Sequence, residues 1–135
     1  MSLRLVAIVL IALVVAALGG WFAGASGRSV VELERNRFEM RAEFAESRAL
    51  ILDGRVNLFQ SNFGNVIERF QNARNLIGRV QVQLREIGQV EQAGRLEIAQ
   101  SHLNDAQHKA AAFDTAGAQF AAEQAINALA AAAGY

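Results

Sequence analysis

Apolar residues recur along positions 38–87 at alternating steps of four and three residues, with no polar interruption. The series consists of Phe38, Ala42, Ala45, Ala49, Leu52, Val56, Phe59, Phe63, Val66, Phe70, Ala73, Ile77, Val80, Leu84 and Ile87. Such heptad spacing keeps an apolar stripe on one face of a helix and predicts a left-handed supercoil with a partner helix. We therefore predict one helix over 38–87, about 75 Å long at about 1.5 Å per residue, and call this series the heptad seam.

Two segments inside the seam have the composition of turns. Asp53-Gly54 is a turn-type dipeptide, and residues 61–65 combine Ser, Asn and Gly. The seam keeps its phase through both segments, which a turn would restore only by coincidence. Gly54 and Gly64 lie off the seam, where a glycine weakens a helix by about 1 kcal/mol without opening its packed face. The favoured interpretation is a continuous helix, with a break at Asp53-Gly54 as the alternative.

The apolar pattern changes phase after Ile87. It resumes at Leu96 in a new register that includes Leu103, Phe113 and Phe120. This second stretch is rich in alanine, which favours helix but offers little apolar area per residue, so the helix needs a neighbour. The alternative is one unbroken helix with a stutter that associates in parallel with copies of itself.

A tight turn between the two registers would fold the second helix back along the first. Either Gly88 or Gly94 would supply the left-handed residue of a helix C-cap. In such a hairpin, large residues face small ones, as in the pairs Phe70 with Gly117 and Ile77 with Ala110. The predicted fold class is therefore all-α, with residues 28–135 forming an antiparallel helical hairpin or coiled coil whose turn lies near 88–94.

An apolar run occupies residues 5–25 and is bounded by Arg4 and Arg28. It is long enough to cross the hydrocarbon core of a bilayer, about 30 Å, so we predict a single membrane-spanning helix, a signal anchor, over 1–27. A cleaved signal peptide is the alternative. Small residues spaced by four would allow close helix contact in lipid. They are Ala12, Ala16, Gly20 and Gly24.

Composition narrows the classes of function. The 135 residues include no Pro and no Cys. The absence of Cys excludes disulfides, iron–sulfur clusters and thiolate zinc sites. Basic and acidic residues balance at 13 each, whereas nucleic-acid-binding proteins usually carry a basic footprint. We therefore expect no nucleic-acid partner.

Candidate chemistry is sparse along the chain. His102, Asp105 and His108 are spaced by three, but two histidines six positions apart do not share a helical face. No serine lies in a G-x-S-x-G context and the glycines form no phosphate-binding loop. We therefore expect a protein that is not an enzyme and that has no catalytic residue, no cofactor and no metal site.

These features favour a structural role in a membrane. We expect a single-pass protein of the bacterial inner membrane, an accessory, scaffold or assembly subunit of a membrane complex that acts by helix–helix packing. Its partners would be other subunits or copies of itself, together with membrane lipid. Arginines flank the apolar run on both sides, so the topology stays open, and we favour a periplasmic helical region. The alternatives are a sensor-type module and an exported helical bundle that binds a small ligand.

Overall fold

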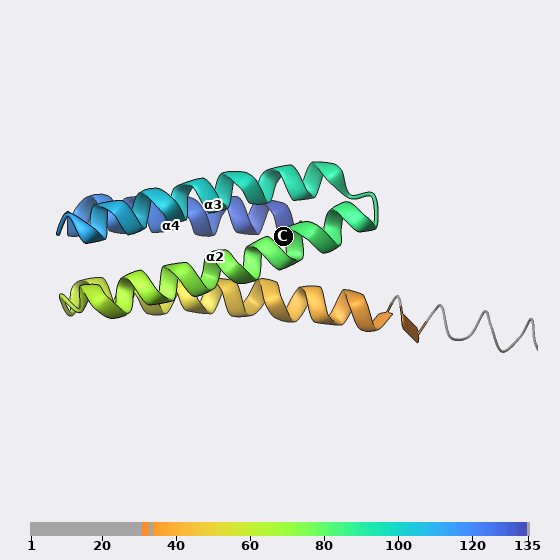
Figure 1. The fold of residues 1–135 in the computed structure, drawn as a ribbon, viewed down its shortest axis with the longest axis horizontal. Helices are drawn as coiled ribbons and strands as arrows, with labels where there is room; N and C mark the ends of the chain where they lie inside the picture. Colours follow the sequence, from red (N-terminus) through yellow and green to blue (C-terminus); the bar gives the residue numbers. More distant parts are fainter. Residues whose placement is uncertain (1–30, 33, 135) are drawn as a thin grey trace, which may run out of the picture. The chain divides into compact units, whose positions relative to one another are not determined.

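The computed structural model describes residues 31–32 and 34–134, and its compact unit of residues 39–135 carries the fold. A helix covers residues 34–59, and its portion inside this unit is called the 39–59 helix. It is followed by α2 (Phe63–Glu86), α3 (Val90–Ala111) and α4 (Thr115–Ala133) (Figure 1). The described residues form only helices and short turns, which confirms the all-α prediction.

The unit is a four-helix bundle in which consecutive helices run antiparallel (Figure 1). Its helices pack in chain order, α2 on α3 and α3 on α4. The 39–59 helix contacts α2 through an ion pair between Asp53 and Arg69, 2.7 Å long. It also contacts α4, because the guanidinium Nε of Arg55 donates to Gln119 Oε1 at 2.8 Å. These contacts to both the second and the fourth helix close the ring.

The predicted continuous helix over 38–87 is wrong. The chain leaves the first helix after residue 59 and starts α2 at Phe63. The alanine-rich stretch is likewise divided, because α3 ends at Ala111 and α4 begins at Thr115. The bundle therefore has two more helices than the predicted hairpin.

The reversal between α2 and α3 occurs at residues 87–89, at the start of the predicted 88–94 turn. Because the turn comes earlier than predicted, each residue of α2 lies beside a residue of α3 that is closer in sequence than the predicted one. Gln81 Nε2 donates to the carbonyl oxygen of Ala93 at 3.1 Å, and Arg74 donates to Gln107 Oε1 at 2.8 Å. Phe70 packs against Gly54 of the 39–59 helix, whereas a Cβ added at Gly117 would meet Asp114 and Lys109. The predicted pairing of Phe70 with Gly117 is therefore wrong.

All three turns use the same backbone motif, the Schellman C-cap. Each has one residue with positive φ: Ser61 at 56°, Gly88 at 79° and Phe113 at 60°. In each, the next residue's N–H bonds five positions back, as from Asn62 to the Asn57 carbonyl at 3.0 Å. The prediction that a glycine at 88 or 94 caps the helix before the turn is confirmed at Gly88.

The core is built from heptad positions on every helix, the packing typical of a four-helix bundle. In α2 the buried series runs from Val66 to Leu84, and in α3 from Ala93 to Ala110. The α3 and α4 series are mostly alanine, so these two helices contribute little side-chain volume to the core. The buried residues of α4 are Ala118, Ala121, Ala122, Ala125, Leu129 and Ala132.

The predicted membrane helix over 1–27, with its small residues Ala12, Ala16, Gly20 and Gly24, lies outside the described residues. Among the helices that the structure describes, none combines the length and hydropathy needed to span a bilayer.

Candidate interaction surface

The 39–59 helix carries two apolar faces. One packs into the bundle and consists of Met40, Phe44, Ser47, Ile51, Gly54 and Leu58. The other is the first part of the heptad seam and is exposed; we call Ala42, Ala45, Ala49, Leu52, Val56 and Phe59 the outer stripe. Leu52, Val56 and Phe59 retain 41%, 51% and 76% of their accessible surface. Within the described part of the chain, no partner buries these large apolar side chains.

Helix geometry separates the two faces. Each member of the outer stripe follows a buried or half-buried residue of the inner face by one or two positions, as Leu52 follows Ile51 and Val56 follows Gly54. Since consecutive residues are about 100° apart around a helix, the outer stripe points away from the bundle axis. Both faces have the same alternation of four and three residues. The heptad seam traced in the sequence follows the outer face.

Charged residues border the outer stripe along its full length. On one side, toward α4, lie Arg41, Arg48 and Arg55, which are seven positions apart. On the other side, toward α2, lie the acidic residues Glu39, Glu46 and Asp53, again seven positions apart. We call these the arginine row and the acidic row.

The C-terminal members of both rows are held by the bundle. Arg55 donates to Gln119, and its guanidinium lies 3.8 Å from the Glu123 carboxylate. Asp53 pairs with Arg69. By contrast, Arg41, Glu46 and Arg48 are exposed and form no ion pair within the described part of the chain. Their charges are available to a partner.

A small groove adjoins the arginine row, between the 39–59 helix and α4. It encloses about 340 Å³ and is lined by Arg41, Phe44, Ala45, Arg48, Leu129, Ala130 and Ala133. Except for the two arginines, its lining is apolar. The groove thus extends the apolar surface of the outer stripe toward α4.

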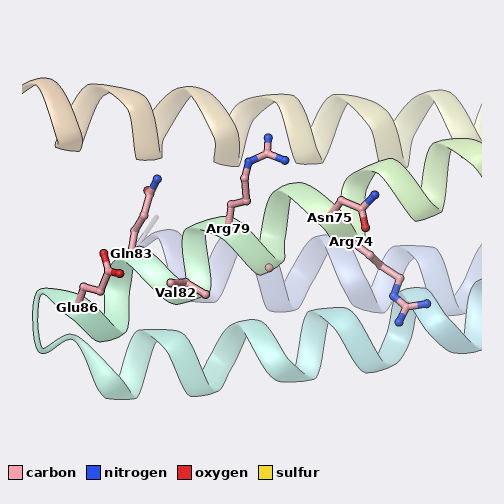
Figure 2. Close-up of a pocket in the computed structure, with 7 residues that line it drawn as sticks. Arg74, Asn75, Arg79, Val82, Gln83 and Glu86 are labelled. Carbon is pink, nitrogen blue, oxygen red and sulfur yellow. The ribbon is translucent and has the colours of Figure 1, made fainter.

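A larger hollow follows the outer face of α2, and Figure 2 shows its lining side chains. All seven lining residues belong to α2, and their side chains fan outward without converging on a common point. Arg79 pairs with Glu43 at 2.9 Å, and Arg74 donates to Asn104 and Gln107. Because both arginines already have partners, this hollow is a weaker candidate for a binding site.

The structure divides the predicted seam residues into two groups. Those in the bundle core are Val66, Phe70, Ile77, Val80, Leu84 and Leu103, and Phe63 is half-buried. Those that are exposed are Phe38, Leu52, Val56, Phe59, Ile87, Phe113 and Phe120. Within the described part of the chain, this second group does not lie on a packed face. The turns at 60–62 and 112–114 reset the rotation of the following helix, so the core register restarts there.

Phe113 is exposed at 72% of its surface, yet its ring is not isolated. It meets the Phe63 ring edge-on, with centroids 5.0 Å apart. This contact joins the turn between α3 and α4 to the first residue of α2, at the end of the bundle where two of the three turns lie (Figure 1). It is a bridge between turns at the surface.

Sequence reasoning missed the buried face of the 39–59 helix. Met40, Ile51 and Leu58 are core residues, although none belongs to the heptad seam. The signal was present, because positions 40, 44, 47, 51, 54 and 58 also alternate by four and three. Ser47 and Gly54 interrupt the apolar character of that series and masked it.

The histidines of α3 form no recognisable site. Asp105, which lies between His102 and His108, pairs with Lys109 at 3.1 Å. Within residues 31–32 and 34–134, no three potential metal ligands lie close enough together to hold an ion. What the described surface offers is apolar contact bordered by charge, which suits helix packing. No protein-family model, curated protein or solved structure matches the chain.

Proposed function

We propose that this protein is a non-enzymatic, single-pass membrane protein that serves as a scaffold or assembly subunit through helix–helix packing. The outer stripe is the observation that carries the proposal. It combines continuous apolar character over residues 42–59 with large exposed side chains at Leu52, Val56 and Phe59. Burying apolar surface gains roughly 25 cal/mol per Å², so this helix gains stability when a partner covers it.

The rest of the bundle supports a rigid structural role. Its core is filled by side chains in heptad register, and the shared turn motif holds consecutive helices antiparallel. A scaffold of this kind presents the outer stripe with little rearrangement, which limits the entropic cost of association.

The proposed membrane anchor is the apolar run over residues 5–25. Its length matches a bilayer span, and the first helix of the bundle follows closely in sequence. We assign the protein to the bacterial inner membrane, with the bundle on the periplasmic side, and expect lipid contact along the anchor. Other subunits of a membrane complex or copies of the chain would cover the outer stripe.

Native mass spectrometry of the full chain, extracted from its own membrane in mild detergent, tests this proposal. We expect the intact 14.6 kDa chain in a complex with other proteins or with itself. Leu52→Glu should release partners bound to the outer stripe, whereas Val82→Glu, at an exposed position on α2, should retain them. An intact chain that is monomeric in gentle extraction would contradict the proposal.

A second candidate is an exported bundle that binds a small ligand, and the groove beside α4 favours it. An apolar lining with Arg41 and Arg48 at its edge suits an amphipathic anion. The same mass spectrum distinguishes this candidate, because it requires a shortened, monomeric chain whose apolar run has been removed.

A further inference from the structure

The outer stripe and its two charged rows together make a complete heptad pattern. If Ala42, Ala49 and Val56 are the a positions, then Ala45, Leu52 and Phe59 are the d positions. The arginine row then occupies every g position and the acidic row every e position over residues 39–55. In coiled coils, the e and g residues flank the apolar seam and determine which partner binds and in which orientation.

We propose that the outer stripe packs against the same stripe of a second copy of this chain, in parallel and in register. This inference rests on the proposed function and specifies its partner. In a parallel pair in register, each a and d layer is formed by the same residue from both chains, so the stripe can pack against its own copy.

The charges select the parallel orientation. In a parallel pair, a g residue lies beside the e residue five positions further along the partner. Arg41 would lie beside Glu46 of the partner subunit, and Arg48 beside Asp53 of the partner subunit. In an antiparallel pair, arginine would meet arginine and acid would meet acid. Because one row is entirely basic and the other entirely acidic, only the parallel pair brings opposite charges together.

Side-chain size alone would favour the opposite orientation. In an antiparallel pair, Ala42 would face Phe59 and Ala49 would face Leu52, which places small residues against large ones. Besides the charges, the membrane opposes this arrangement. Two chains anchored through their N-termini in one bilayer project their first helices in the same direction, which brings the outer stripes together in parallel.

Reciprocal charge reversal on the full chain in lipid nanodiscs or mild detergent tests the pairing. Arg41→Glu and Glu46→Arg change exposed residues that form no ion pair in the described part of the chain, so the bundle should stay folded. Each single variant should weaken dimer formation by about tenfold, since two cross-chain attractions become repulsions. The double variant restores the attraction and should recover the dimer. Glu68→Arg, on the exposed face of α2, is the matched control.

Cysteine cross-linking tests the register, because the natural chain contains no cysteine. Ala42→Cys should form a disulfide between two copies in a parallel pair. In an antiparallel pair, the two introduced thiols would be about 25 Å apart along the helix axis. Ser101→Cys, exposed on α3, should remain uncross-linked.

The inference is overturned by a monomer at all concentrations, by a dimer whose stability is unchanged by either charge reversal, or by a dimer without the Ala42→Cys cross-link. Co-purification with a different protein in the absence of self-association would also overturn it, while leaving the scaffold function intact. A shortened, monomeric chain would overturn both.

Discussion

The ring of Phe70 occupies the space where a side chain at Gly54 would be. A Cβ atom added to Gly54 would come within 2.5 Å of Phe70 Cε1 and 2.8 Å of Cδ1. Phe70 is fully buried, so the absence of a side chain at Gly54 allows the 39–59 helix and α2 to approach closely. The glycine that suggested a break in the helix is a packing site inside a helix.

We predict that Gly54→Ala destabilises the bundle. The added methyl group would force the Phe70 ring to move, and overpacking of this kind typically costs about 1–3 kcal/mol. The gain in helix propensity, about 1 kcal/mol, offsets only part of that cost. Gly94→Ala is the matched control, because nothing lies within 4 Å of its added Cβ, and it should stabilise. Chemical denaturation followed by circular dichroism measures both, and equal effects would contradict the packing argument.

Phe70 and Phe113 should differ sharply when truncated, although both belong to the predicted apolar registers. Phe70→Ala removes a fully buried ring and should cost about 3–5 kcal/mol. Phe113→Ala removes a mainly exposed ring whose edge-on contact with Phe63 is worth about 0.5–1.5 kcal/mol. Unfolding free energies of the two variants test this difference. A large loss from Phe113→Ala would mean that the turn between α3 and α4 carries more of the stability than its exposure implies.

Ser61→Gly should stabilise the protein. Ser61 holds a φ of 56°, and the left-handed region costs a residue with a side chain about 1–2 kcal/mol. Glycine enters this region freely, so we expect a gain of about 1 kcal/mol after the added flexibility of the unfolded chain is included. Ser101→Gly, in the middle of α3, should instead destabilise. Thermal melting distinguishes the two variants. A lower melting temperature for Ser61→Gly would show that the backbone of Ser61 is not strained.

Asp114→Ala should weaken the start of α4. The Asp114 carboxylate accepts a hydrogen bond from the backbone N–H of Gly117 at 2.9 Å, and loss of an N-cap of this kind costs about 0.5–2 kcal/mol. Asn62 and Gln89 occupy the equivalent positions before α2 and α3, but their side chains form no cap bond. Alanine at either position should therefore cost less. Denaturation midpoints of the three variants provide the comparison.

The sequence by itself determined the helical class and much of the core. Heptad spacing can be satisfied only by helices that pack lengthwise, and the series from Val66 to Leu84 and from Leu96 to Ala110 are buried as their spacing indicates. Gly88 marked its turn correctly, because only glycine enters the left-handed region without cost.

Tertiary structure decided where the other two turns lie and which stripe of the first helix enters the core. Residues 61–65 have the composition of a turn, but the unbroken phase of the seam favoured a continuous helix there. Ser61 and Phe113 adopt positive φ at the two turns, and neither is the glycine that usually marks such a conformation. The 39–59 helix has two stripes with the same spacing, and periodicity cannot rank them. The contact of Gly54 with Phe70 buries one stripe because it allows the helices to approach closely, and it leaves the more apolar stripe on the surface.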